Sequence, residues 1–388
     1  MRLRPIAVLF VIALVARLGA AWVLGGEYYF ADETEYMDAA VRLQAGRGFD
    51  ARYDRVPLYP IFLAAVAGIA PDGVTGVRFL QGAVAAGGCP LVVAVGTRAF
   101  GPGPALAAGL LYAVDPLLVI GAALFYPEAV AAVLLLAATW LAIRAGRGDR
   151  AGAPAGAGVV LGILAQLRPV ALVLVPVLAA WTAATGGRRR IVNAAVLVIA
   201  CLATLAPWTY RNYRVHGEVF PIATRGIEAV PVAGETVRAR GVIGTLAQRA
   251  WDDPGSFARR VAREFGHFWE LVPRRLMTDD ARGRAELHAR DARLPVEQRF
   301  PLRLRDVVSA VSFGAELTLA IVGLAAVRAT GRREAGLLAG LTLAYALACA
   351  LVIGRLRYRI VVLPLVFLFA GNGAAVLARR LGVIRVAP

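Results

Sequence analysis

Residues 5–37 read PIAVLFVIALVARLGAAWVLGGEYYFADETEYM, a long apolar run followed closely by two adjacent carboxylates, Asp32 and Glu33. A helix of about 20 mostly apolar residues spans roughly 30 Å, the thickness of the hydrocarbon core of a membrane. The run therefore predicts a first transmembrane helix over Pro5–Leu24. The two carboxylates are expected just beyond the end of this helix, where the chain has crossed the membrane.

Similar apolar runs follow along the whole chain. Hydrophobic residues make up 59% of its 388 residues, which is more than in an ordinary soluble domain. We expect an all-α polytopic membrane protein with about ten spans. The further predicted spans are Val77–Arg98, Pro104–Leu124, Pro127–Arg144, Ala155–Leu167, Val170–Thr185, Ile191–Trp208, Asp306–Val327, Glu334–Ile353 and Ile360–Ala378. The segment Pro57–Ala70 is too short to cross and is predicted to lie at the interface.

Basic residues give the expected orientation. The formal net charge is +17, every basic residue is an arginine, and many arginines fall in short loops on one side of the predicted spans. We expect the protein in the inner membrane of the cell. Short cytoplasmic loops carry excess basic residues, so both termini are expected on the cytoplasmic side. Topology explains this charge, and nucleic acid is not an expected partner. A cleavable signal peptide is the alternative for residues 1–24, but a retained anchor suits a chain that is membrane-embedded throughout.

Three parts of the chain are predicted from this pattern. Residues 1–208 form a transmembrane module with a first outer loop over residues 25–76. Residues 209–305 form an extracytoplasmic segment with amphipathic interfacial helices, one of which begins at Asp253 and Pro254. Residues 306–388 form a C-terminal part with three spans.

Carboxylates recur at the outer ends of the predicted spans. Asp32 with Glu35 matches a capping box at a helix start, so capping and chemistry are both open for Asp32 and do not exclude each other. Glu128 lies in the outer turn between two spans, where an ionisable group is costly unless it is paired or faces a watery cavity. These carboxylates are the candidate acids or bases of an outer site.

Arginines are expected at the same depth as these carboxylates. They are Arg168, Arg211, Arg357 and Arg359, and Arg17 interrupts the first span near its outer end. A guanidinium holds a phosphate through two parallel hydrogen bonds, so several arginines at one depth are suited to clamp a lipid phosphate. The alternative is that some of them only extend to the interface.

Other chemistry has no support in the sequence. Cys89, Cys201 and Cys349 all fall in predicted spans without CxxC spacing, the three histidines lack an HExxH motif, and no Walker motif for ATP is present.

The order of these elements resembles the GT-C class of integral-membrane glycosyltransferases, particularly the bacterial relatives of protein O-mannosyltransferases and of the lipid A aminoarabinose transferase. The matching residues run across nearly the whole chain: Arg17, Asp32-Glu33 with Tyr36, Gly46-Arg47-Gly48-Phe49, Pro57-Leu58-Tyr59-Pro60, Tyr126-Pro127-Glu128, Leu167-Arg168-Pro169, Pro207-Trp208 with Arg211-Asn212-Tyr213, and Arg357-Tyr358-Arg359 with Pro364.

The resemblance implies a seven-helix core with interfacial helices in the first outer loop and an active site at the extracytoplasmic face. It implies an inverting transfer of a sugar from a polyprenyl-phosphate carrier to a hydroxyl of a lipid, polysaccharide or protein. Asp32 is expected to act as the base, and Glu33 and Glu128 to complete an acidic wall. Members of this class differ in metal use, so a divalent ion such as Mg, Mn or Zn on Asp32 and Glu128 stays open.

The remaining roles follow from the same resemblance. Arg168, Arg211, Arg357 and Arg359, together with Arg17, are the expected donor phosphate ligands. Tyr36, Tyr59 and Tyr126 are the expected contacts to sugar or acceptor, and membrane lipids surround the protein. A transporter or flippase of a lipid-linked sugar is the competing interpretation, because charges inside a membrane also mark transport paths.

Overall fold

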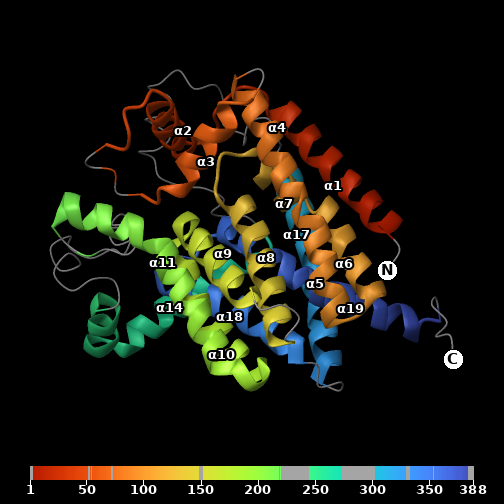
Figure 1. Ribbon diagram of the computed structural model, residues 1–388. Helices are drawn as coiled ribbons and strands as arrows, with labels where there is room; N and C mark the ends of the chain where they lie inside the picture. The colour runs from red at the N-terminus through yellow and green to blue at the C-terminus, as the bar shows by residue number, and fades with distance from the viewer. Residues whose placement is uncertain are drawn as a thin grey trace.

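The computed structural model describes residues 3–50, 53, 55–70, 73–147, 152–217, 219, 244–272, 302–328, 333–352 and 354–382. Within these ranges every regular element is a helix, as predicted (Figure 1). The start of α1 (Leu3–Leu24) and the end of α19 (Leu363–Arg380) lie at the right of this view, whereas α2 (Ala31–Gln44) and α14 (Pro254–Phe268) lie at its left.

A helix or a pair of helices occupies each predicted span. In chain order these are α1 (Leu3–Leu24), α4 with α5 (Gly73–Ala86 and Gly88–Ala99), α6 with α7 (Pro102–Val114 and Pro116–Ala123), α8 (Glu128–Gly146), α9 (Ala153–Leu167), η1 with α10 (Pro169–Val173 and Leu174–Thr185), α11 (Arg190–His216), α17 (Leu302–Arg328), α18 (Arg333–Val352) and α19 (Leu363–Arg380). Among the described residues, 6 helices are long and apolar enough to cross a membrane, or 7 if the bent pair α6–α7 counts as one span. The predicted spans beyond these are shorter or less apolar helices.

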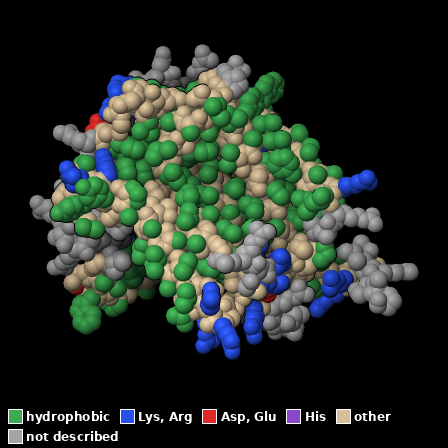
Figure 2. Space-filling model, viewed as in Figure 1, with side chains coloured by type: hydrophobic (Ala, Val, Ile, Leu, Met, Phe, Trp, Pro, Cys, Tyr) green, Lys and Arg blue, Asp and Glu red, His purple; other side chains and the backbone are tan. Residues whose placement is uncertain are grey.

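The outer surface of the helices fits a lipid environment. Side chains such as Val11 and Trp22 on α1, Ile199 on α11, and Val311 and Ile321 on α17 are between 54% and 74% exposed. Figure 2 shows the apolar surface covering the middle of one face, with arginine side chains along its edges. A continuous apolar surface of this kind would be unfavourable in water, and this chain is a multi-pass membrane protein.

Helices α2 (Ala31–Gln44), α3 (Leu58–Ala67) and α14 (Pro254–Phe268) lie outside the predicted spans. The start of α14 is confirmed, because Asp253 accepts a hydrogen bond from the Ser256 N–H at 2.9 Å. The predicted capping box of Asp32 with Glu35 is wrong. The helix begins earlier, after Phe30, and Glu33 is the third-position residue whose carboxylate accepts from the Phe30 N–H.

The third predicted span is broken, with a bend of 49° between α6 and α7. Pro116 lacks an N–H and keeps Asp115 out of the helical conformation, so α6 stops there. The Asp115 carboxylate caps α7 through the Leu118 N–H at 2.7 Å. Arg17 from α1 donates to the free carbonyls of Tyr112 and Ala113 at the end of α6. The free backbone groups at both helix ends of the break therefore have hydrogen-bond partners inside the protein.

The C-terminal helices pack directly on the N-terminal module, with α19 lying between α6 and α17. Glycines allow this close approach. A Cβ on Gly323 of α17 would lie 1.9 Å from the Phe369 carbonyl oxygen of α19, and one on Gly373 would lie 2.0 Å from the Leu319 oxygen. Small residues let membrane helices approach backbone to backbone, so the two parts form one packed unit.

Candidate functional site

Asp32 lies between two arginines from distant parts of the chain. Its Oδ2 accepts from Arg357 Nη1 at 2.9 Å, and its Oδ1 accepts from Arg55 Nη2 at 3.1 Å. Arg55 also pairs with Glu35, one turn further along α2. Asp32 is therefore an ionised carboxylate with one guanidinium on each oxygen.

Glu128 lies on the other side of Arg357. Its Oε1 is 3.2 Å from Arg168 Nη1 and 3.6 Å from Arg357 Nε, and its side chain is only 1% exposed. Neither Glu128 oxygen has a well-aligned hydrogen bond, although both are buried. Such a buried carboxylate is costly without its arginines, and its oxygens retain capacity for a further donor.

Four segments bring these groups together. Asp32 is in the first turn of α2, Glu128 opens α8, Arg168 follows the end of α9, and Arg357 belongs to η3 (Leu356–Val361). Aromatic rings support the arginines. The Arg357 guanidinium lies 4.6 Å from the Tyr126 ring centre, and that of Arg168 lies 4.0 Å from the ring centre of Tyr358. Flat cations over ring faces are held in a fixed orientation.

The pKa of Asp32 reflects these contacts. Burial raises the pKa of the carboxyl, but Arg357 and Arg55 lower it by more, so the pKa of Asp32 lies well below its usual value. The same arginines that hold Asp32 have the geometry to hold a phosphate instead. An anion that drew Arg357 or Arg55 away would make Asp32 a stronger base.

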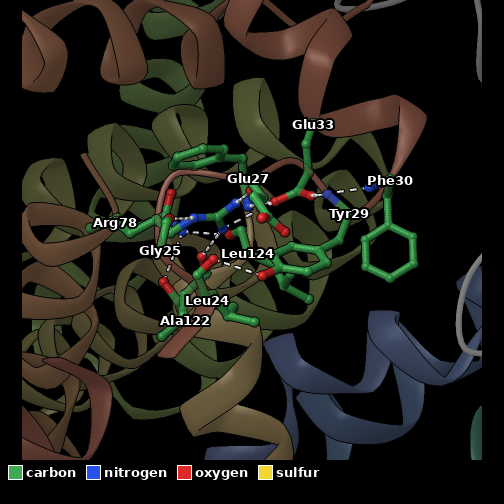
Figure 3. A network of polar contacts seen from close by, with 12 residues as sticks. Leu24, Gly25, Glu27, Tyr29, Phe30, Glu33, Arg78, Ala122 and Leu124 are labelled. Atoms are coloured by element: carbon green, nitrogen blue, oxygen red, sulfur yellow. Dashed lines mark hydrogen bonds and ion pairs between the residues drawn. The ribbon is translucent and has the colours of Figure 1, made fainter. Parts of the chain in front are cut away.

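Glu33 is adjacent to Asp32 in sequence but belongs to a different network (Figure 3). Its Oε2 accepts from the N–H groups of Tyr29 and Phe30 at 2.6 and 3.1 Å. Its Oε1 accepts from the Phe125 N–H at 2.8 Å and pairs with Arg78 at 3.2 Å. Both oxygens of this fully buried carboxylate are occupied by protein donors. The geometry thus supports a structural role for Glu33 in place of the predicted catalytic one.

Arg78 completes this network on α4. Its side chain is 0% exposed and donates to the carbonyls of Gly25, Glu27 and Ala123, in addition to the Glu33 pair. Gln81, one turn later, donates to the carbonyls of Ala122 and Leu124. The end of α7 and the start of the first outer loop are therefore joined through α4.

Other predicted residues lie outside the Asp32–Glu128 cluster. Arg17 donates to backbone carbonyls at the α6–α7 break and is 1% exposed. Arg211 donates to the carbonyls of Tyr53 and Asp50 and so holds the first outer loop to α11. Arg359 donates to the Glu270 carbonyl and lies against the Phe313 ring. Of the five arginines predicted to bind phosphate, Arg168 and Arg357 lie at the Asp32–Glu128 cluster, and these three make contacts elsewhere.

The predicted tyrosines divide in the same way. Tyr126 stacks on Arg357, and the Tyr36 ring lies 5.1 Å from the Arg55 guanidinium. Tyr59 is fully buried, and its hydroxyl donates to Gln81 at 2.7 Å. Tyr59 supports Tyr36 from behind, edge to face at 4.9 Å between ring centres.

Sequence reasoning missed Arg55, Arg78 and Tyr358 as site or support residues. Arg55 lies two residues before Pro57, the first residue of the Pro57-Leu58-Tyr59-Pro60 string in the first outer loop, and that position is its only sequence signal. Arg78 stands at the outer end of an apolar span, where an arginine is also expected simply to extend to the interface. Its partners become evident only when α4, α7 and the loop are assembled.

A divalent cation does not fit between Asp32 and Glu128 in this arrangement. Guanidinium groups occupy the positions beside both Asp32 oxygens and beside Glu128 Oε1. Among the described residues no group of three His, Cys, Asp or Glu side chains is close enough to hold a metal ion. Hard cations such as Mg²⁺ need several oxygen ligands, and here the positive charge comes from arginine.

Comparison with known proteins supports the resemblance noted from the sequence. A family described as dolichyl-phosphate-mannose-protein mannosyltransferase matches residues 54–210. This range includes Arg55, Arg78, Glu128 and Arg168. No curated protein sequence matches the chain.

Solved structures show the same fold at low sequence identity. The apo oligosaccharyltransferase of Archaeoglobus fulgidus is 13% identical with a TM-score of 0.62, over 98% of this chain and 51% of its own. The same protein was solved with Zn and sulfate, at 13% identity and a TM-score of 0.61 over 98% of this chain and 50% of its own. ArnT from Cupriavidus metallidurans bound to undecaprenyl phosphate is 15% identical with a TM-score of 0.60, over 98% of this chain and 62% of its own.

This chain therefore has the fold of the GT-C glycosyltransferases and resembles them in sequence. It spans about half the length of the oligosaccharyltransferase and about three fifths of ArnT.

Proposed function

We propose that this protein is an extracytoplasmic glycosyltransferase that moves a sugar from a polyprenyl-phosphate carrier to an acceptor hydroxyl with inversion. The observation that carries the proposal is the cluster of Asp32, Glu128, Arg55, Arg168 and Arg357. These residues come from three helices, the turn after α9 and one loop, and carboxylates alternate with arginines in the order Arg55, Asp32, Arg357, Glu128 and Arg168. The match of residues 54–210 to the mannosyltransferase family supports the same reaction class.

The reaction needs a base and a cationic site for the leaving group, and the cluster contains both. The acceptor oxygen attacks the anomeric carbon while Asp32 takes the hydroxyl proton. The bond from the anomeric carbon to the phosphate oxygen breaks, and the electron pair leaves with the polyprenyl phosphate. Arg168 and Arg357 then stabilise the charge on that phosphate.

Each arginine of the cluster is paired with a carboxylate, and this gives donor binding a second effect. A donor phosphate on Arg357 competes with Asp32 for the same guanidinium. Weakening the Asp32–Arg357 pair raises the pKa of Asp32 toward its ordinary value, because the pair is one of the main causes that lower it. Donor binding thus strengthens the base at the moment the acceptor needs it.

The location and partners belong to the proposal as well. The arginine-rich loops favour a cytoplasmic location for both termini, with α2, η3 and the site on the opposite side of the inner membrane. The acceptor is a hydroxyl-bearing lipid, polysaccharide or protein.

A flippase of the lipid-linked sugar is the second candidate, and the broken span at Asp115 favours it, because transporters use interrupted helices near the bilayer midplane. Both ends of this break are already capped by Arg17 and Asp115, which favours a structural use of the bend.

The deciding experiment is a transfer assay in nanodiscs with a panel of radiolabelled polyprenyl-phosphate sugars and membrane extract as acceptor. Wild type should pass label to a new product, Asp32→Asn should not, and Asp38→Asn on the exposed face of the same helix should match wild type. Movement of the intact donor across vesicles without a new covalent product would overturn the proposal in favour of the flippase.

A further inference from the structure

A second charged cluster lies behind the candidate site, on the opposite side of η3. It contains Asp115 at the α6–α7 break, Glu316 on α17 and Arg359 on η3, which are 3%, 5% and 1% exposed. Burying three ionisable groups away from the site is costly unless they interact. The transfer reaction described above uses none of them.

Asp115 and Glu316 are the acidic side chains whose charges act on Arg359. The close contacts of Arg359 are with a backbone carbonyl and an aromatic ring.

Arg359 is anchored on further sides. Its Nη1 donates to the Glu270 carbonyl at 2.9 Å, and its guanidinium lies 3.4 Å from the centre of the Phe313 ring. It therefore connects η3 to the segment after α14 and to α17. None of its described contacts is with Asp32, Glu128 or the arginines around them.

The backbone near η3 is held from α14 as well. Glu264 accepts from the Gly354 N–H at 2.9 Å, and Arg260 donates to the carbonyls at the end of α18. A Cβ on Gly354 would lie 1.9 Å from the Glu264 carbonyl oxygen, so only glycine allows this contact. These contacts fix where η3 begins.

The geometry of a 3₁₀-helix links the two clusters. Its residues advance by about 120° each, so side chains two positions apart project from different faces. Arg357 projects to Asp32 and Glu128, and Arg359 projects to the Glu270 carbonyl and the Phe313 ring. A helix of only two turns has little rigidity of its own, and its orientation depends on the contacts that hold each face.

We propose, on the basis of the transferase function above, that Arg359 is a positioning residue, held by the Glu270 carbonyl and the Phe313 ring, which fixes η3 so that Arg357 meets Asp32 and the donor phosphate. Arg359 itself touches no substrate. A misplacement of about 1 Å in a catalytic group can lower a rate roughly 100-fold, so the anchor is expected to matter for rate as well as for stability.

The first test does not depend on activity. Hydrogen exchange of residues 354–362 is compared between wild type, Arg359→Ala and Arg147→Ala in nanodiscs. Arg147 forms an ion pair with Glu334 at another place in the structure, so its variant is the matched control. Faster exchange at residues 354–362 in Arg359→Ala alone supports the anchor, and unchanged exchange there overturns it.

The second test measures coupling to Arg357 in the transfer assay, per mole of folded protein. Arg359→Ala should lower kcat/KM for the donor about 10- to 100-fold, and it should lower it less than about 3-fold when Arg357 is already alanine. Arg359→Lys, which keeps the charge, should recover part of the loss. Losses that multiply in the double variant would show a purely structural role and refute positioning.

Two further outcomes are informative. If Arg359→Ala cannot be purified, Phe313→Leu serves in its place, because leucine removes the aromatic ring against which the Arg359 guanidinium packs. Exchange at residues 354–362 faster than in Arg147→Ala supports the anchor, and exchange equal to it counts against it. If wild type transfers no sugar from any donor, the proposed function fails, while the exchange experiment still decides the anchoring of η3.

Discussion

Glu33→Gln tests whether the two adjacent acids of the first outer loop do different work. The substitution keeps the size and shape of the side chain but replaces one carboxylate oxygen by an NH₂ group and removes the charge. In the structure each oxygen of Glu33 faces two donors, from Tyr29 and Phe30 on one side and from Phe125 and Arg78 on the other. Either orientation of the glutamine amide therefore places a donor against two donors.

The expected cost follows from these contacts. Each buried donor left without an acceptor costs about 1–3 kcal/mol, and an uncompensated buried charge such as Arg78 costs about 3–5 kcal/mol. These costs overlap because they concern the same side chain. We expect Glu33→Gln to lower the free energy of unfolding by about 3–5 kcal/mol.

Asp32→Asn is the matched comparison on the neighbouring residue. Arg55 and Arg357 keep Glu35 and Glu128 as partners when the Asp32 charge is removed. We expect this change to cost about 1 kcal/mol or less, as for a partly exposed pair, while it removes transfer.

The chain offers a direct assay of unfolding. All three cysteines, Cys89, Cys201 and Cys349, are buried, so a thiol-reactive fluorescent dye reports their exposure as detergent-solubilised protein is heated. Glu33→Gln should melt well below both wild type and Asp32→Asn. A Glu33→Gln protein with the wild-type midpoint and no transfer would refute the structural role and return Glu33 to the chemistry.

Further predictions concern charge, packing and metal. The Asp32 pairs should stabilise the fold fully above the ordinary aspartate pKa and lose this effect as pH falls below it, because the folded-state pKa is lowered; the difference in melting midpoint between wild type and Asp32→Asn should therefore shrink on acidification below about pH 4. Arg357→Ala should lower kcat/KM for the donor at least about 10-fold in the transfer assay, and an unchanged dependence on donor concentration would count against a phosphate contact. Gly323→Ala should sharply lower the melting midpoint, since its Cβ would meet the Phe369 carbonyl oxygen at 1.9 Å, whereas Gly314→Ala on the same helix has nothing within 4 Å and should be neutral or stabilising by up to about 1 kcal/mol. Transfer should survive prolonged treatment with EDTA, and recovery of a lost activity by added Mg²⁺, Mn²⁺ or Zn²⁺ would show that arginine does not replace a metal here.

The length of the apolar runs determined most of the fold, and this length is read directly from the sequence. Every predicted span contains a helix, because a run of about 20 apolar residues has few other stable states in a membrane. The bend at Asp115 was missed, since the run Pro104–Leu124 is continuous in hydropathy and its break depends on one residue before a proline. Hydropathy measures how apolar a segment is and gives no information on where its backbone turns.

The site was predicted only in part, because the sequence indicates how deep in the membrane a residue lies but not which way its side chain projects. Asp32, Glu128, Arg168 and Arg357 were expected at one level, and the structure brings them together. Arg359 was expected at that level too, yet it points to the other face of η3. Its direction depends on a 3₁₀ turn that no local pattern in the sequence indicates.

The Arg78 network also has a consequence for how the chain is made. Its carbonyl and carboxylate partners lie at residues 25, 27 and 33 on one side and at residue 123 on the other. An arginine cannot give up its proton, so the charge of Arg78 has no partner until these groups are in place. The ribosome must therefore synthesise the chain past residue 123, and the broken third span must enter the membrane, before the first outer loop can adopt its final structure. In biosynthesis, the loop that carries Asp32 is completed late although it is translated early.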